Sequence, residues 1–271
     1  MRRGYLATSS GLIHYRTAGS GEERLLLLHQ TPLSSAVYDH LLPLFAERYC
    51  VVAIDTPGYG ESDPPPPGGW GIPDYARAVI EALDALGWQR AHLVGRLTGC
   101  SVAVEVAAAA PERIQRLVLS GLPDYDEETR QAKLAALKWT PMRPDGSQTT
   151  ELWRFLRATN PALPTAVIHR MHLGILRPGP RNEEAHRAVF RYDPKTRIPA
   201  IEAPTLLLYG ERDYFLDRIE TLRPLFRRAQ LQFIPGGQQL IFENPVGFAG
   251  AVLDFLARPL APSQPEPHTD Q

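Results

Sequence analysis

The hydrophobic residues of this chain form two kinds of segment. Short continuous apolar runs, such as residues 25–28, are typical of strands that are covered on both faces of a sheet. Longer segments repeat apolar residues every three or four positions, as residues 73–86 do, and this spacing predicts amphipathic helices. Strands are expected at residues 11–17, 24–29, 49–55, 91–94, 114–120, 205–209 and 229–234. Helices are expected from Ser34 onward and at residues 73–86, 99–110, 216–226 and 246–256. Alternating strands and helices predict an α/β fold with a mostly parallel sheet and helices on both faces.

The alternation stops in the middle of the chain. From about Leu122 to Glu202 the pattern is helical only, and Pro-rich breaks separate the helices. The expected helices cover residues 133–139, 152–157, 165–176 and 183–190. We therefore predict a core made of residues 1–121 and 203–258, with a helical cap at 122–202. The segment 259–271 has four prolines among polar residues and is expected to be disordered.

Charge and cysteine content exclude several classes of function. The 29 basic and 30 acidic residues give a formal net charge of −1, which argues against a nucleic-acid surface or a polybasic membrane contact. Cys50 and Cys100 each lie beside an apolar run and are expected to be reduced thiols. No signal-like region and no apolar span of about 20 residues occurs, which predicts a cytoplasmic protein. A small-molecule ligand is the expected partner, and the oligomeric state stays open, with a homodimer as one option.

Six short motifs follow the predicted elements in a characteristic order. They are His29-Gln30-Thr31-Pro32, residues 55–62, Val94-Gly95-Arg96-Leu97-Thr98-Gly99, residues 111–114, residues 208–213, and residues 236–245. Together with the helical insertion, these motifs resemble the α/β-hydrolase fold superfamily, in a form with a cap domain. The resemblance covers nearly the whole chain up to about Arg258. It implies an oxyanion loop at residues 29–32, a nucleophile elbow at 94–99, an acid at Asp213 and a base near Gln238.

Two of the catalytic positions that the resemblance implies hold unsuitable residues. The family pattern Gly-x-Ser-x-Gly places a serine on a strained turn, whereas here Gly95 and Gly99 flank Leu97. Gln238 stands where the family has its histidine, and its amide does not accept a proton near neutral pH. An alignment shifted by one residue meets Gln239 instead. A conventional serine hydrolase is therefore not expected. The remaining serines lack the elbow context; they include Ser34, Ser35, Ser101 and Ser120.

The catalytic prediction rests on Asp213 and His29. Without an imidazole partner and beside apolar Leu97, Asp213 is expected to have a raised pKa and to act as general acid or base. The alternative is that Asp213 holds its own loop through backbone hydrogen bonds. His29 either supports the oxyanion loop, as the resemblance implies, or carries a proton.

The substrate-binding prediction combines backbone and side-chain groups. The backbone N–H of Thr98 and an N–H from the loop of Gln30 and Thr31 would bind a carbonyl or carboxylate oxygen even without a nucleophile. A substitute nucleophile from Thr98, Cys100 or Ser101 is disfavoured, because these side chains turn into helix packing. Arg96 either binds an anionic group of the substrate or forms an ion pair with Asp124 or Asp213. Leu97 and Gln238 complete the floor of the pocket.

In the predicted cap, His169 and His172 lie three positions apart and share one helix face. A metal site would need a third ligand that the sequence does not offer, so neither a metal nor a cofactor is expected. His172 and Trp139 are expected at the roof of the pocket. The aromatic residues of the cap either form its core or face a partly apolar ligand; they are Trp139, Trp153, Phe155 and Tyr192.

Two hypotheses about function remain open at this point. The first is an enzyme that works by acid–base chemistry on a small, partly apolar carbonyl compound in a cap-covered pocket. Its reaction would be that of a lyase, decarboxylase, isomerase or cyclase, or a water-mediated hydrolysis. The alternative is a catalytically silent protein that binds a ligand or a partner on a degenerate hydrolase fold.

Overall fold

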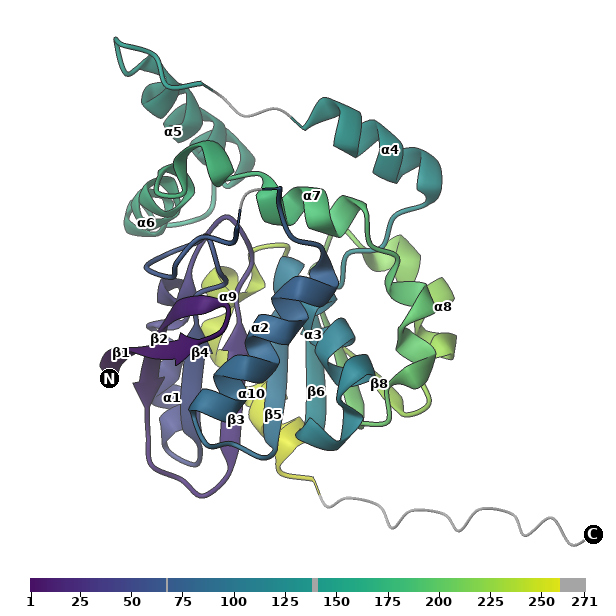
Figure 1. The fold of residues 1–271 in the computed structure, drawn as a ribbon. Coiled ribbons are helices and arrows are strands. Elements are labelled where there is room, and N and C mark those ends of the chain that lie inside the picture. The colour runs from purple at the N-terminus through teal and green to yellow at the C-terminus, as the bar shows by residue number, and fades with distance from the viewer. Residues whose placement is uncertain (67, 138–140, 259–271) are drawn as a thin grey trace, which may run out of the picture.

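The computed structural model describes residues 1–66, 68–137 and 141–258 of the 271-residue chain. An eight-stranded sheet forms its centre, in the order β1-β2-β4-β3-β5-β6-β7-β8 (Figure 1). Strands β1 (Arg2–Thr8), β2 (Gly11–Ala18) and β4 (Cys50–Ile54) pair antiparallel at one edge. All other pairs are parallel, and they involve β3 (Arg24–Leu28), β5 (Ala91–Arg96), β6 (Ile114–Ser120), β7 (Thr205–Arg212) and β8 (Ala229–Gly237). The predicted mostly parallel sheet is confirmed.

Helices cover both faces of the sheet because successive strand residues point to opposite sides. On β3, Leu26 and Leu28 pack in one apolar cluster, and Leu25 and Leu27 pack in the other. The first cluster receives helices α2 (Ile72–Ala85) and α3 (Thr98–Ala109), and the second receives α1 (Leu42–Ala46) and α10 (Pro245–Leu256). Each buried strand therefore needs an apolar residue at almost every position, which explains the continuous apolar runs.

Two expected helices are interrupted. The segment that starts at Ser34 forms a 3₁₀ helix, Ser35–Tyr38, followed by the separate helix α1. The predicted helix at 216–226 consists of the 3₁₀ helices Leu216–Arg218 and Arg223–Leu225 around α8 (Ile219–Leu222). Pro43 and Pro224 start new short elements, because proline supplies no N–H for a continuing helix. The short helix α9 (Leu240–Glu243) was not predicted.

Four helices lie above the carboxyl ends of the strands (Figure 1): α4 (Glu127–Ala136), α5 (Ser147–Thr159), α6 (Thr165–Leu176) and α7 (Glu184–Phe190). Helices α4 and α5 begin five or six residues earlier than predicted, because their first turns carry no apolar residues to mark them. The expected end of the first cap helix, at 138–139, and the expected disorder at 259–271 lie outside the described residues. Ile168 and Met171 of α6 join the apolar cluster under the sheet face of α1 and α10, so the helices above the sheet share its core.

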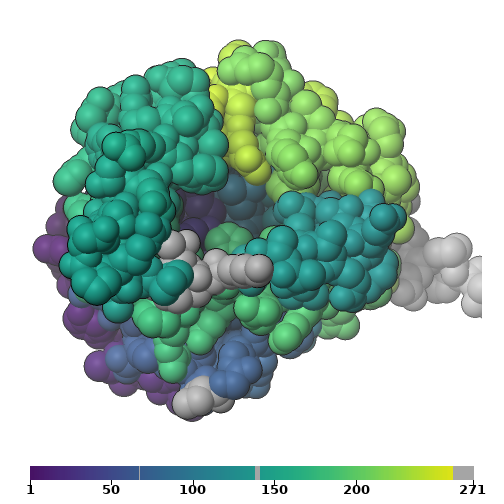
Figure 2. Space-filling model, turned by 90° about the horizontal axis from the view of Figure 1, so that it is seen from above, coloured from purple at the N-terminus to yellow at the C-terminus, as the bar shows by residue number. Residues whose placement is uncertain are grey.

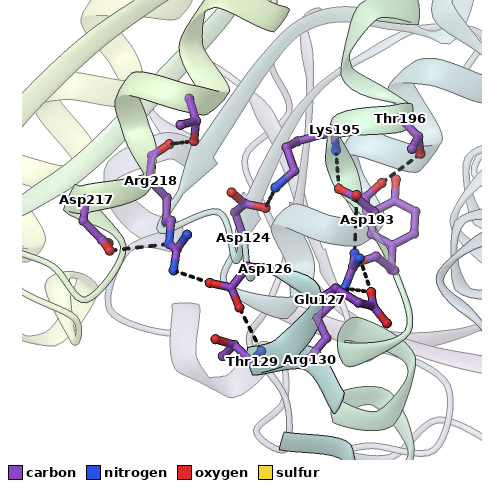
Figure 3. A network of polar contacts seen from close by, with 12 residues as sticks. Asp124, Asp126, Glu127, Thr129, Arg130, Asp193, Lys195, Thr196, Asp217 and Arg218 are labelled. Atoms are coloured by element: carbon purple, nitrogen blue, oxygen red, sulfur yellow. Dashed lines mark hydrogen bonds and ion pairs between the residues drawn. The ribbon is translucent and has the colours of Figure 1, made fainter. Parts of the chain in front are cut away.

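Polar contacts attach the beginning of α4 to residues that precede and follow β7 in the chain (Figure 3). The carboxylate of Asp126 caps the helix by accepting from the N–H of Thr129 at 2.8 Å, and it also accepts from Arg218 at 3.0 Å. Arg130 lies 3.5 Å from a carboxylate oxygen of Asp193. Nearby, the buried Asp124 accepts from the ammonium of Lys195 at 2.8 Å. These contacts fix the entry of the chain into the helices above the sheet.

Among the described residues, none of the helices has the length and apolar character needed to cross a bilayer.

Candidate functional site

The turn between β5 and α3 places Leu97 at the carboxyl edge of the sheet. Leu97 has φ of 47°, a left-handed conformation that is strained for a residue with a side chain. Its N–H donates to the carbonyl of Ser120 at 3.0 Å, which holds the turn against β6. The flanking glycines are sterically required, because a Cβ on Gly95 would lie 2.5 Å from the Gly99 carbonyl oxygen and one on Gly99 would lie 2.3 Å from that of Leu28. The strand–turn–helix geometry of an elbow is therefore present, with leucine at its apex.

The loop after β3 contacts both the elbow and the loop after β8. The hydroxyl of Thr31 donates to the hydroxyl of Thr98 at 2.9 Å. The side-chain amide of Gln30 donates to the side-chain oxygen of Gln239 at 3.1 Å. Three loops that are far apart in the sequence thus meet at one edge of the sheet, as parallel strands require.

A cavity of about 440 Å³ lies above this edge. Four of the residues predicted to bind substrate line it: Gln30, Thr31, Leu97 and Gln238. The helices above contribute Phe155, Leu156, Thr159, Asn160, Met171 and Ile175. A second cavity of about 520 Å³ within these helices shares Phe155 and Ile175 with the first, and its other apolar lining includes Leu152 and Leu176. Seen from above, the molecule is hollowed between α4 and the α5–α6 pair (Figure 2).

Asp213 directly follows strand β7 and lies close to Leu97. Its Oδ1 accepts from the N–H of Phe215 at 3.0 Å, whereas its Oδ2 is buried and has no partner among the described residues. A Cβ built on Gly121 would lie 3.0 Å from Leu97 Cδ2 and 3.2 Å from Asp213 Oδ2, so both groups meet over Gly121. Burial raises the pKa of Asp213, and the hydrogen bond from Phe215 and the charge of Arg96 only partly oppose this shift.

Arg96 is fully buried beneath the elbow and does not line the cavity. Its guanidinium donates to the hydroxyl of Ser120 at 3.2 Å and to the backbone carbonyl of Gln238. Among the described residues, no carboxylate lies within 4.0 Å of it, so neither expected ion pair forms. Burial lowers the pKa of Arg96, and Asp213 is one of the groups whose charge opposes this shift. Arg96 therefore acts as a strut between the elbow and the loop of Gln238.

His29 is completely buried and both of its ring nitrogens are engaged. The N–H of Thr56 donates to Nε2 at 2.9 Å, so Nδ1 carries the proton and donates to the carbonyl of Gln30 at 2.9 Å. Burial lowers the pKa of His29, which keeps the ring neutral. These contacts support the loop after β3 and leave no free nitrogen for proton transfer, so of its two expected roles the structural one fits the geometry.

Of the two predicted roof residues, His172 lies away from the cavity at Leu97. His172 Nε2 donates to the carbonyl of Thr149 at 2.8 Å, and its ring packs edge-on against Trp153, so it joins α6 to α5. Neither His172 nor Thr98 is among the residues that line the cavity at Leu97, and Trp139 lies outside the described residues. Tyr192 donates to Glu105 at 3.0 Å, away from the cavity. The described residues contain no cluster of three side chains suited to bind a metal ion.

Sequence reasoning did not assign several of the residues that line the cavity, and Gln239 and Glu243 are among them. The carboxylate of Glu243 accepts from the N–H of Gln239 at 3.2 Å and from the N–H of Gly237. It thereby holds the loop that presents Gln238 to the cavity. An acidic residue five positions after Gln238 was the available signal, but no periodicity distinguishes it from an ordinary surface residue.

Comparison with known proteins gives three kinds of match. Residues 23–147 match the family described as alpha/beta hydrolase fold. A relative from Variovorax paradoxus named "Putative carbamate hydrolase RutD" is 30% identical over 93% of this chain and 99% of its own length. A 2-hydroxy-6-oxononadienedioate/2-hydroxy-6-oxononatrienedioate hydrolase from Paraburkholderia phymatum is 38% identical over 113 residues, which are 40% of this chain and only 39% of that relative. The crystal structure of a hydrolase from Pseudomonas aeruginosa superimposes with a TM-score of 0.81, with 28% identity, 95% of this chain and 99% of that chain covered.

These matches correct the functional prediction made from the sequence. The named relatives are hydrolases, so the expectation of a lyase, decarboxylase, isomerase or cyclase was wrong, and so was the alternative of a catalytically silent protein. The error came from letting the absence of a serine favour other reactions over hydrolysis, although the oxygen that hydrolysis adds to the substrate comes from water.

Proposed function

Because this chain belongs to the α/β-hydrolase fold family, we propose that it is a hydrolase that cleaves a bond at a carbonyl carbon of a small, partly apolar compound. The names of two relatives support this choice, since a carbamate and a 6-oxo acid both contain a carbonyl carbon. The proposal that this chain is a hydrolase rests on its match to the carbamate hydrolase relative, which covers nearly the full length of both proteins.

The oxygen of the carbonyl would lie at the amino-terminal end of α3. The first backbone N–H groups of this 12-residue helix have no acceptor within the helix, and the helix dipole favours a developing negative charge there. The loop of Gln30 and Thr31 faces the same point, since Thr31 hydrogen bonds to Thr98. Backbone N–H groups from the two segments would stabilise the oxyanion of a tetrahedral intermediate.

We propose that the catalytic triad is degenerate and that water replaces the serine. Leu97 offers no nucleophilic atom and Gln238 no basic nitrogen. A water oxygen would bond to the carbonyl carbon while its proton passes to Oδ2 of Asp213. The bond to the leaving group would then break, and the leaving group would take that proton. The observation that carries this role is the buried, unpartnered Oδ2 of Asp213 beside Leu97. Its raised pKa makes the carboxylate a stronger base than an exposed one.

The lining of the two neighbouring cavities suits a substrate with an apolar part. Its carbonyl end would lie near Leu97 and Gln238, and its apolar part would extend past Phe155 and Ile175, which belong to both cavities. In this proposal the helices of residues 122–202 act as the cap. The cytoplasmic location and the option of a homodimer stay predictions.

The proposal is tested by measuring turnover with three classes of carbonyl substrate. These are aryl esters of short- and medium-chain acids, an aryl carbamate, and a 6-oxo-dienoic acid. The wild type is expected to hydrolyse at least one class, and Asp213→Asn is expected to lose about 100-fold or more in kcat/KM because a general base contributes that much. Asp254→Asn, an exposed carboxylate on α10, serves as the matched control.

Two results would count against the proposal in different ways. If the folded wild type turned over none of the three classes, hydrolysis itself would be refuted. If Asp213→Asn retained the activity of Asp254→Asn, hydrolysis would stand, and the role of Asp213 as base would fall.

A further inference from the structure

Arginine side chains surround a cavity at the amino-terminal edge of the parallel sheet, opposite to the edge that holds Leu97. This cavity measures about 350 Å³. Arg48, Arg90, Arg116 and Arg258 line it, and Glu23 is the one carboxylate among the described lining residues. The cavity therefore has a surplus of positive charge, although the chain as a whole is close to neutral.

An irregularity in strand pairing forms the inner wall of this cavity. In the register of β5 with β6, Ala91 pairs with Ile114 and Leu93 pairs with Leu117. His92 alone therefore opposes two residues, Gln115 and Arg116, which is the arrangement of a β-bulge. A bulge redirects the side chains beside it, and here His92 and Arg116 both reach the cavity while only 3% and 5% exposed.

Polar atoms of two side chains in this wall, His92 and Gln115, lack hydrogen-bond partners in the part of the chain that the structure describes. Both ring nitrogens of His92 and the Oε1 of Gln115 have no hydrogen bond. The nearest carboxylate oxygen, on Glu23, is 3.8 Å from His92 Nε2. Arg116 donates to the backbone carbonyl of Arg258 and packs over the ring of Phe255 at 5.3 Å. Buried polar groups normally find partners, so this wall is prepared for one that comes from outside.

The positive charges of the wall are only partly compensated by Glu23. Burial and the charges of Arg116 and Arg90 lower the pKa of His92 to about 4. His92 is therefore neutral at pH 7 and has a ring N–H to donate. Burial and the neighbouring charge of Arg228 lower the pKa of Arg116 as well. An anion in the cavity would oppose both shifts, because it favours the charged form of each side chain.

We propose that this cavity binds the phosphate group of a small phosphorylated molecule, through the guanidinium groups of Arg48, Arg90 and Arg116 and a ring N–H of His92. Guanidinium groups match phosphate oxygens in geometry and bind them bidentately. The positive charge of four arginines exceeds the negative charge of one glutamate, so a ligand that balances it needs more than one negative charge. A phosphate group supplies this charge and a single carboxylate does not. The site is independent of the hydrolytic function proposed above.

The test uses the full-length chain and inorganic phosphate as the probe. Phosphate is titrated at constant ionic strength, balanced with sodium chloride, while heat release and the ring proton signals of the histidines are recorded. The signal of His92 is assigned with the variant His92→Gln. Saturable heat release is expected together with a shift of the His92 signal and a rise of its pKa by one unit or more.

Variants at the rim make the test specific without disturbing the core. Arg48 and Arg90 are exposed, so the double variant Arg48→Gln/Arg90→Gln is expected to fold normally and to bind phosphate at least tenfold more weakly. Arg191→Gln, an exposed arginine after α7, is the matched control and is expected to bind like the wild type. Phosphate binding that leaves the His92 signal unchanged would place the anion elsewhere and overturn the proposal. An equal loss in Arg191→Gln, or no saturable binding in the wild type, would also overturn it.

Discussion

The hydroxyl of Thr31 donates a hydrogen bond to the hydroxyl of Thr98 over 2.9 Å, and both side chains are buried. This bond connects the loop after β3 with the first residue of α3, although 67 positions separate the two threonines. The two segments that carry the proposed oxyanion donors are therefore held at a fixed distance from each other. Pre-positioned donors stabilise charge more effectively than mobile ones, because no reorganisation is needed during the reaction.

The first prediction concerns this bond. Thr31→Val and Thr98→Val are each expected to lower the free energy of unfolding by about 1 kcal/mol, since each leaves a buried hydroxyl without its partner. The double variant is expected to lose less than the sum, with a coupling of about 0.5–1.5 kcal/mol measured by chemical denaturation. Thr221→Val, at an exposed threonine of α8, is the control. Strictly additive losses would show that the two hydroxyls do not interact in solution.

The second prediction concerns the pH dependence that Asp213 imposes. Only its carboxylate form accepts a proton from water, so kcat/KM is expected to rise with pH through the raised pKa of Asp213. Folding stability should move the other way. A carboxyl whose pKa is raised in the folded state stabilises fully below its unfolded value of about 3.8, and this stability is lost as pH rises through the folded pKa.

Melting temperatures of the wild type and Asp213→Asn, measured from pH 3 upward, check the stability part. The variant is expected to lose less stability than the wild type across that interval, because its amide does not ionise. Parallel curves for the two proteins would contradict a raised pKa at this residue.

The third prediction concerns Asp55, which has the opposite shift. Burial raises its pKa, but the hydrogen bond with His14 at 2.8 Å and the N–H groups of Ser35 and Glu61 outweigh burial and bring it to about 2. A carboxyl with a lowered pKa stabilises the fold above its unfolded value of 3.8 and loses this effect as pH falls toward 2.

The shift corresponds to about 2 kcal/mol of stability at neutral pH. Asp55→Asn is therefore expected to unfold more easily by at least that amount at pH 7, and the difference from the wild type should shrink below pH 4. Denaturation at pH 7 and pH 3 measures both values. Asp63→Asn, a carboxylate in the same loop region, is the comparison; an equal destabilisation there would remove the special role of Asp55.

The fourth prediction restores the residues that the family resemblance implies. The double variant Leu97→Ser/Gln238→His would place a hydroxyl at the apex of the elbow and an imidazole between that hydroxyl and Asp213. It is expected to hydrolyse aryl esters about 100-fold or more faster than Leu97→Ala/Gln238→His and to show a burst of released phenol from an acyl intermediate. Equal rates of the two double variants would show that the elbow does not support covalent catalysis. The hydrogen bond from Arg96 to the backbone of residue 238 would then be the first contact to remove by mutation.

The fifth prediction concerns the attachment of α4. Asp126 both caps this helix and accepts from Arg218 (Figure 3). Asp126→Ala removes both contacts and is expected to speed amide hydrogen exchange over residues 127–136 by several-fold, without a comparable change in α2. Asp217→Ala, which removes only a neighbouring carboxylate of Arg218, is the control. Equal exchange in both variants would show that the cap of Asp126 is not what orders α4.

Much of the fold followed from local pattern. Buried parallel strands need apolar residues on both faces, so runs such as residues 25–28 reveal them, and the spacing in residues 73–86 reveals a helix. Proline limited this reading, because Pro43 and Pro224 divided elements whose apolar spacing is continuous. The residue types at Leu97 and Gln238 were also legible, and a degenerate triad at these positions stays a prediction.

What the sequence determined by itself was thus the α/β-hydrolase fold and the chemistry that Leu97 and Gln238 do not offer, because both depend on residue type and on neighbours along the chain. Only the tertiary structure decided that both nitrogens of His29 are occupied, that Arg96 is a buried strut, and that Oδ2 of Asp213 has no partner. Likewise, only the tertiary structure showed that His92 and Arg116 line the same cavity. Hydrogen bonding and burial depend on contacts between residues far apart in the chain, and local pattern carries no information about which of those contacts form.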